Sequence, residues 1–210
     1  MPGFGTTADY DDRAATWDDD PDRRARSQTV AKRIHELVRP TTATRVLEYG
    51  AGTGLLGFAL KPYVGHMTLA DISDGMLEQV RRKIAASGMP DVEWRKLDLT
   101  TDPLPAQRWD LVALQLILHH ILDTDRILKA LHDVLEPDGV LVVADMDLED
   151  GTFHREAFEG YFGFEREPLK EKVLAAGFAS CEFDDVLTVH KVRGGVGREY
   201  PMFLMIARRR

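Results

Sequence analysis

The feature that most constrains this chain is a short apolar segment that runs directly into alternating glycines. It spans Val46–Tyr49 and is followed by Gly50, Gly52 and Gly54. Glycine lets the backbone turn tightly and lets a ligand approach where a β-carbon would block it. In an open parallel sheet, such a turn lies at the carboxyl edge, where ligands bind. The sequence therefore predicts a ligand site between this strand and the helix after it.

Further along the chain, short apolar runs alternate with segments of helical period, which is typical of a parallel sheet with helices on both faces. The predicted strands are Arg45–Tyr49, His66–Asp71, Val92–Leu97, Trp109–Leu114 and Val140–Met146, followed by a hairpin of Glu182–Val192 and Tyr200–Arg208 around a glycine-rich loop. Helices are predicted from Asp20 to Pro40, from Ser73 to Gly88, from Asp123 to Leu135 and from Pro168 to Gly177. We expect a single α/β domain.

The residue pattern of the glycine loop matches the binding motifs of two cofactors. Gly52–Gly57 matches the dinucleotide fingerprint, and Asp71 follows about 20 residues later, as that fingerprint expects. However, the glycines begin earlier, at Gly50, and an acidic residue, Glu48, precedes them inside the strand. This series resembles motif I of the class I S-adenosylmethionine (SAM) methyltransferases. Later motifs, up to residue 210, resemble the type 11/12-like, small-molecule branch of that family, and a nicotinamide oxidoreductase is the alternative.

The resemblance implies a fold and a set of cofactor contacts. The fold would be a Rossmann-like, doubly wound seven-stranded sheet of order 3-2-1-4-5-7-6 with an antiparallel seventh strand. Asp71 would accept hydrogen bonds from both ribose hydroxyls, since a carboxylate can serve a vicinal diol, and Asp98 would meet the adenine amino group. The cofactor-binding residues expected in this way are Glu48, Gly50, Ala51, Gly52, Thr53, Gly54, Asp71, Ile72, Met76, Asp98, Leu99, Gln115 and Trp17.

Two segments stand outside the alternation of strands and helices. Residues 1–41 are expected to form an N-terminal lid and helix, and residues 42–210 the SAM-binding methyltransferase domain. Within that domain, residues 147–167 are rich in aromatic side chains and are expected to form a second lid. Aromatic rings near a sulfonium cation can build an apolar acceptor pocket with cation–π character.

The candidate bases lie after the fourth strand and in the second lid. His119 and His120 follow the strand at the sheet edge where chemistry is expected, and His154 and Tyr161 lie in residues 147–167. Methyl transfer from a sulfonium needs alignment and exclusion of water, so that a base is optional. Adjacent histidines chelate a metal poorly without a carboxylate or third histidine nearby, so no metal is expected.

Charge and composition restrict the partners and the location. The formal net charge of −8 disfavours a nucleic-acid partner, and Cys181 alone cannot form an intrachain disulfide. With no signal-peptide pattern and no apolar run near roughly 20 residues, we expect a cytoplasmic protein, monomeric or homodimeric, that does not bind membranes. The expected reaction gives S-adenosylhomocysteine and methylates an O, N, C or S atom of a small molecule. The alternatives are a non-catalytic SAM-binding module and a protein or tRNA methyltransferase that requires a partner.

Overall fold

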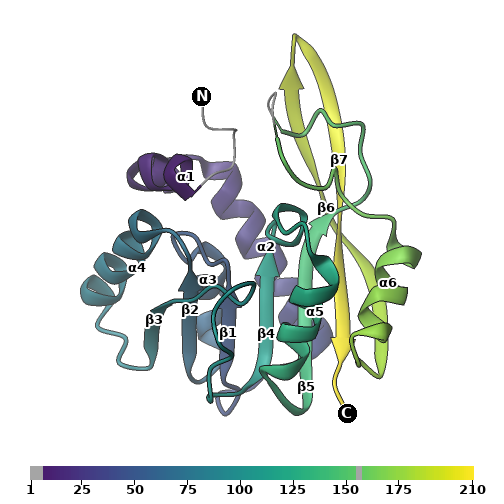
Figure 1. Cartoon of the computed structure of the whole chain (residues 1–210). Helices are drawn as coiled ribbons and strands as arrows, with labels where there is room; N and C mark the ends of the chain where they lie inside the picture. Colours follow the sequence, from purple (N-terminus) through teal and green to yellow (C-terminus); the bar gives the residue numbers. More distant parts are fainter. Residues whose placement is uncertain (1–6, 155–157) are drawn as a thin grey trace.

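A computed structural model describes residues 7–154 and 158–210. Its strands form one sheet of order β3-β2-β1-β4-β5-β7-β6, in which β7 is antiparallel to both of its neighbours and the other pairs are parallel (Figure 1). The strands are β1 (Val46–Tyr49), β2 (Met67–Asp71), β3 (Val92–Lys96), β4 (Trp109–Gln115), β5 (Leu135–Met146), β6 (Ser180–Arg193) and β7 (Val196–Arg208). The order and the direction of the seventh strand confirm the predicted fold class.

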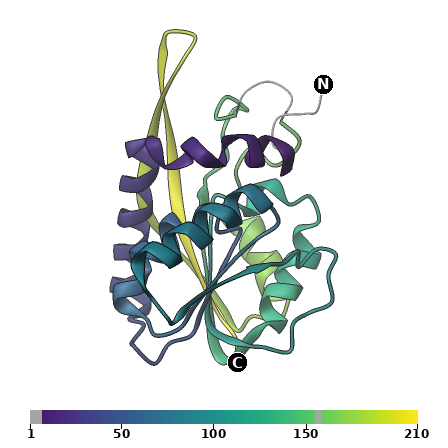
Figure 2. The same ribbon diagram turned by 90° about the vertical axis from the view of Figure 1, so that its left-hand side faces the viewer.

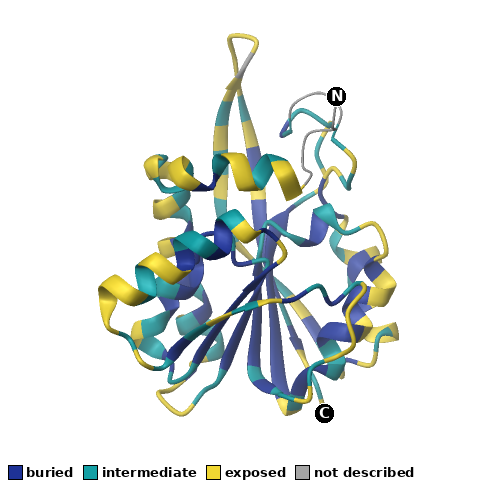
Figure 3. Cartoon of the chain, turned by 60° about the vertical axis from the view of Figure 1, so that its left-hand side comes forward, coloured by how far each residue is buried: buried dark blue, intermediate teal, exposed yellow. Residues whose placement is uncertain are grey.

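Helices cover both faces of this sheet. They are α1 (Thr7–Arg13), α2 (Pro21–Val38), α3 (Leu55–Leu60), α4 (Asp74–Ser87), α5 (Thr124–Asp133) and α6 (Arg166–Ala175), with short 3-10 turns η1 (Ala14–Asp19), η2 (Lys61–Tyr63) and η3 (Leu118–His120). One apolar cluster joins the sheet to α5 and α6, and a second joins the other face to α2 and α3. The central strands are accordingly buried on both faces (Figure 3). Among the described residues, no helix is long and apolar enough to span a membrane.

The predicted helix caps are present at the expected residues. Asp20 accepts the N–H of Asp22 at 3.0 Å before Pro21 opens α2. Ser73 Oγ accepts the N–H of Met76 at 3.1 Å, and α4 ends at Gly88 in the left-handed region. These caps fix where α2 and α4 begin.

Several boundaries move by one or two residues from the prediction, as where α6 begins at Arg166 rather than at Pro168, and two move further. Leu135 is predicted in the helix before β5, but its backbone pairs with Trp109 in β4, and residues 136–139 bulge between this pair and the next. In the hairpin, the turn needs only Gly194 and Gly195, both with positive φ, so β7 begins at Val196 rather than at Tyr200.

At the carboxyl edge of the parallel strands, α1 and η1 cross above the sheet, and the tip of the β6–β7 hairpin extends past the same edge (Figures 1 and 2). The chain between β5 and α6 also lies at this edge. Leu148 and Glu149 donate their N–H groups to the carbonyls of Phe164 and Phe162, at 3.1 and 2.8 Å, and so close this segment into a loop. Three parts of the chain therefore meet above the glycine turn.

Candidate functional site

The glycine turn after β1 is shaped by positive φ angles. Gly50, Gly52 and Gly54 have φ of 71°, 55° and 82°. A β-carbon on Gly50 would lie 2.5 Å from Cγ1 of Ile117, in the loop after β4, so this glycine allows two loops to approach each other. A β-carbon on Gly52 would meet only the sulfur of Met76, at 3.9 Å. The space above Gly52 is therefore open.

Asp71 lies at the end of β2, beside this turn. Its carboxylate accepts the N–H of Gly52 at 2.7 Å and that of Ser73 at 2.9 Å. Burial raises the pKa of Asp71, and the backbone N–H groups of Ser73, Gly52 and Ile72 oppose that rise. A carboxylate has about four lone-pair positions, so each oxygen of Asp71 can still accept a hydrogen bond from a ligand.

Glu48 lies within β1 and is almost completely buried, with 3% of its surface exposed. Its Oε2 accepts the N–H of Gly57 at 2.8 Å and so ties the first turns of α3 to the strand. Burial raises the pKa of Glu48 to about 8. The side chain is therefore mostly protonated at neutral pH, and its observed contact positions the glycine turn.

Asp98 follows β3, the strand that pairs with β2. It accepts hydrogen bonds from the N–H and the hydroxyl of Thr100, at 2.8 and 2.5 Å. Burial works to raise the pKa of Asp98, but the hydrogen bonds from Thr100 and Thr101 outweigh it and keep the pKa below its usual value. Leu99 is buried, and its N–H donates to the hydroxyl of Tyr49 at 3.1 Å.

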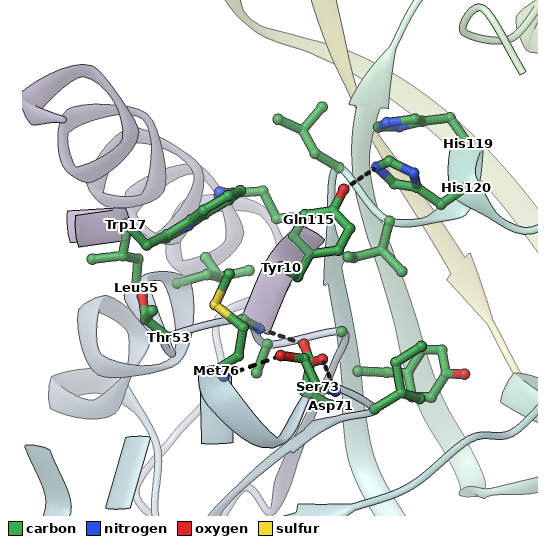
Figure 4. A pocket seen from close by; sticks show the side chains of 18 of the residues that line it. Tyr10, Trp17, Thr53, Leu55, Asp71, Ser73, Met76, Gln115, His119 and His120 are labelled. Atoms are coloured by element: carbon green, nitrogen blue, oxygen red, sulfur yellow. Dashed lines mark hydrogen bonds between the residues drawn. The ribbon is translucent and has the colours of Figure 1, made fainter. Parts of the chain in front are cut away.

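One cavity of about 890 Å³ joins these groups to the candidate bases. Figure 4 shows Asp71 at one end and His119 and His120 at the other. All predicted cofactor residues line this cavity except Gly54 and Leu99. Tyr161 does not line it, because its hydroxyl donates to the carbonyl of Leu122 at 2.8 Å. The structure thus brings together three of the four candidate bases.

Between the two ends of the cavity, polar atoms lack partners. Gln115 donates from Nε2 to the hydroxyl of Ser27 at 2.9 Å, but its buried Oε1 has no hydrogen-bond partner in the described part of the chain. Nε of Arg26 is likewise buried and unpartnered among these residues. Burial, followed by the charge of Arg23, lowers the pKa of Arg26. The sequence prediction missed Arg26, whose only signal was an arginine near the start of an amphipathic helix.

The segment formed by α1 and η1 is attached to the glycine turn and to α4 by two aspartates. Asp18 accepts the hydroxyl of Thr53 at 2.6 Å and pairs with Lys83 at 2.5 Å. Asp11 accepts the hydroxyl of Ser73 at 2.5 Å. The sequence predicts no such contact for either aspartate: Asp18 lies in the run Asp18–Asp20, which indicates only a helix entry, and Asp11 is not singled out by any motif.

Two aromatic side chains of this segment line the cavity. Trp17 lies below the guanidinium of Arg23, which is 3.9 Å from the ring centroid. The hydroxyl of Tyr10 lies 3.2 Å from Nε2 of His120, as the dashed line in Figure 4 shows. Burial raises the pKa of Tyr10 to about 12. The N-terminal segment thus supplies one wall of the cavity.

The histidines form the opposite wall. Nδ1 of His119 lies 2.7 Å from Oδ1 of Asp145, a carboxylate within β5 whose side chain has no exposed surface. The ring of His154 stacks on Phe158 with centroids 3.7 Å apart. Burial, and then the neighbouring His119, lowers the pKa of His120 to about 3. His120 is therefore neutral at physiological pH.

The reason for expecting no metal does not hold in the structure. The sequence argument required a carboxylate or third histidine near His119 and His120, and none was evident. Asp145 and His154 both lie at this point, although each comes from a segment remote in the sequence. A carboxylate inside the apolar run Val140–Met146 was the signal that could have revealed Asp145.

Comparisons with known proteins point to a methyltransferase domain. The family model described as "Methyltransferase domain" matches residues 46–139. The chain is 32% identical over 124 residues to a demethylmenaquinone methyltransferase of Clavibacter sepedonicus, which covers 59% of this chain and 50% of that protein. It is 30% identical over 141 residues to the ubiquinone/menaquinone biosynthesis C-methyltransferase UbiE of Teredinibacter turnerae, covering 65% of this chain and 55% of that one. The chain thus spans about half the length of these curated relatives.

Solved structures agree on the fold. A structure described as a DhpI–SAH complex has a TM-score of 0.71 and 24% identity, covering 97% of this chain and 94% of that one. The family match, the relatives and the strand order all indicate the same class of protein. The family match and the names of the relatives support a class I SAM-dependent methyltransferase, which is a class of enzymes, and the strand order is the one expected for it.

Proposed function

We propose that this chain transfers a methyl group from SAM to a small-molecule acceptor. The observation that carries the proposal is the single cavity, which has Asp71 and the glycine turn at one end and the histidine wall at the other. Its volume of about 890 Å³ lies in the upper part of the roughly 300–1,000 Å³ range of small-molecule sites. Such a cavity has room for a cofactor and an acceptor side by side.

The residues at the glycine end fit the nucleoside part of SAM. Asp71 keeps free lone pairs on both oxygens, as a partner of two ribose hydroxyls must. Gly52 leaves the space above the turn open, so that the backbone can approach a ligand closely. Asp98 lines the same cavity and would meet the adenine amino group, while Ile72 and Met76 line it with apolar surface.

The unpartnered polar atoms fit the methionine part. The methionine ammonium is a donor that would satisfy Oε1 of Gln115, and the methionine carboxylate is an acceptor that would satisfy Arg26. Each of these protein atoms is buried without a protein partner among the described residues, which costs free energy unless a ligand supplies one. The fit therefore rests on atoms of this chain that need a ligand.

The acceptor would lie between Tyr10 and the histidine wall. When bound, SAM supplies a methyl group that is already activated by its sulfonium sulfur. Tyr10, Phe153 and Phe158 give the acceptor space aromatic surface, and His119, His120 and His154 give it polar nitrogens. The walls would align the nucleophilic atom and exclude water, which is the main requirement of this reaction.

The names of the relatives suggest a narrower chemical class of acceptor. They are a demethylmenaquinone methyltransferase and quinone-biosynthesis C-methyltransferases. Together with the aromatic lining, these names support an acceptor with an unsaturated or aromatic ring that carries a hydroxyl group. Methylation at carbon or at oxygen would start from the deprotonated hydroxyl in either case. The N-terminal segment and residues 147–167 would serve as lids over this space.

A labelled-methyl assay tests the proposal. The protein is incubated with methyl-labelled SAM and a panel of hydroxylated aromatic, enol, amine and thiol acceptors, and the methylated products are identified by mass spectrometry. We expect turnover on a hydroxylated ring compound that Asp71→Asn reduces. SAM binding without turnover on any acceptor would instead favour a non-catalytic module, and turnover only with added protein or tRNA would favour the partner-dependent alternative.

A further inference from the structure

Three histidines converge at the acceptor end of the cavity. His119, His120 and His154 each offer a ring nitrogen, and these atoms all lie within 4.8 Å of one another. Within residues 7–154 and 158–210, this is the one cluster of at least three histidine, cysteine or acidic residues with such spacing. His119 is buried, and the other two are partly exposed to the cavity. The cluster is therefore buried on the side of His119 and accessible from the cavity.

His119 is oriented as metal-binding histidines are. Its Nδ1 lies 2.7 Å from Oδ1 of Asp145, so Nδ1 carries the proton and Nε2 presents its lone pair. With 1% of its surface exposed, His119 has no hydrogen-bond partner for Nε2 among the residues described. A carboxylate behind a histidine fixes its tautomer and ring orientation and raises its basicity as a ligand. This nitrogen is left without a partner, and the rings of His120 and His154 lie next to that of His119, with centroids 4.2 and 5.0 Å away.

A backbone hydrogen bond and ring contacts hold His120 and His154 beside His119. The N–H of Tyr161 donates to the carbonyl of His119 at 2.8 Å, which fastens residues 158–164 to the turn that carries His119 and His120. His154 stacks on Phe158 of the same loop, with ring centroids 3.7 Å apart. The ring centroid of His154 lies 5.0 Å from that of His119 and 5.6 Å from that of His120. The convergence is thus supported by contacts outside the cluster.

We infer that His119, His120 and His154 bind one divalent transition-metal ion, with an open coordination position toward the cavity. Imidazole nitrogens suit zinc, cobalt, nickel, copper and iron. Nitrogens on one zinc ion lie about 3.4 Å apart, from bonds of about 2.05 Å and tetrahedral angles, so closing the cluster takes side-chain shifts of about an ångström. An ion bound through Nε2 of His120 would replace its hydrogen bond to Tyr10.

The open position determines what the ion would do. Three protein ligands with a free fourth position are typical of catalytic rather than structural zinc sites. The free position would bind the hydroxyl oxygen of the acceptor and favour loss of its proton to solvent, leaving an oxyanion on the ion for methylation. This role rests on the proposed function, but binding of the ion does not, so the two can fail separately.

Cobalt(II) titration tests the site without SAM or acceptor. The tag-free protein is treated with EDTA, dialysed and titrated with cobalt(II), and the visible absorption of histidine-bound cobalt is followed together with the melting temperature. We expect one ion per chain and a higher melting temperature with cobalt. His154→Gln should lower the affinity at least tenfold, since loss of even an outer partner costs roughly 10–100-fold. Asp145→Asn, which removes such a partner of His119, should weaken binding within that range.

His190→Gln is the matched control, because His190 is an exposed histidine in β6 that pairs with Glu199 outside the cavity. This variant should bind cobalt as the wild type does. The inference is wrong if the wild type shows no histidine-bound cobalt absorption, or if binding persists in His154→Gln. Binding lost in His190→Gln but kept in His154→Gln would place the ion on the surface and would equally overturn it. A separate SAM titration shows whether the cofactor site is intact in each variant.

Discussion

Gly52→Ala separates the two reasons for a glycine at this position, which are backbone conformation and room for a ligand. Gly52 has φ of 55°, which L-residues adopt at a cost of about 1–2 kcal/mol. The added methyl group would meet only Sδ of Met76, at 3.9 Å, and both residues line the cavity. The methyl group would therefore take up room that the cofactor needs rather than disturb the protein around it.

The expected sizes follow from this geometry. The conformational cost should lower the melting temperature by about 2–8 °C, at about 2–4 °C per kcal/mol for a chain of this length. Forcing a methyl group into a fitted contact costs about 1–3 kcal/mol, which is roughly a 5- to 150-fold increase in Kd for SAM. Gly88→Ala is the control, since Gly88 has φ of 62° at the end of α4, and a β-carbon added there would have no neighbour within 4 Å.

Differential scanning calorimetry and isothermal titration measure the two effects. Both variants should melt lower than the wild type by similar amounts, and only Gly52→Ala should lose affinity for SAM. If Gly52→Ala binds SAM as tightly as Gly88→Ala does, the turn at Gly52 does not contact the cofactor, and the placement of the nucleoside above it is refuted.

Three further predictions concern the same edge of the sheet. Because the pKa of Glu48 is raised to about 8, the folded state binds more protons than the unfolded state between about pH 4.5 and 8. As the pH rises across this window, the free energy of unfolding of the wild type should therefore fall relative to that of Glu48→Gln by at most about 1.4 kcal/mol per pH unit. Urea unfolding at several pH values measures both, and an equal change with pH in the two proteins would contradict this. Gly50→Ala should destabilise more than Gly88→Ala, because its β-carbon would lie 2.5 Å from Ile117; adding Ile117→Ala should restore part of the melting temperature, and strict additivity would argue against the clash. Asp18→Asn should speed SAM dissociation in stopped-flow measurements by removing the ion pair with Lys83, whereas Asp19→Asn should not; equal rates would show that the N-terminal segment does not retain the cofactor.

Much of the fold could be predicted because its signals are local. The caps at Ser73 and Asp123 depend on neighbouring residues and lie at the predicted positions. The apolar strands agree with the prediction to within two residues, except at the starts of β5 and β7. The predicted boundaries were wrong where the same sequence pattern fits two local structures. Leu135 continues the helical spacing of Leu131, but backbone pairing with Trp109 places it in a strand. Gly197 is typical of a turn, yet it pairs with Val192 because Gly194 and Gly195 already complete the turn.

The candidate site also has a part that could be predicted from the sequence and a part that could not. The residues of the glycine turn and Asp71 are adjacent to strands whose order the family resemblance supplied, so their convergence could be expected. Arg26 and His154 line the cavity from a helix and a loop, Asp145 contacts His119 from a distant strand, and no sequence spacing relates the three. The contacts of Asp145 and His154 with His119, and the place of Arg26 in the cavity, depend on tertiary packing, which no local sequence pattern encodes.

Isothermal titration with SAM, S-adenosylhomocysteine and reduced nicotinamide dinucleotide tests the central claim most directly. The wild type should bind the first two ligands and not the third. Asp71→Asn should weaken that binding by about 1.5–3 kcal/mol, the scale for hydrogen bonds to a charged group, whereas Asp74→Asn, an exposed site three residues on, should not. A wild type that binds neither SAM nor S-adenosylhomocysteine, or that binds the nicotinamide dinucleotide instead, would contradict the account.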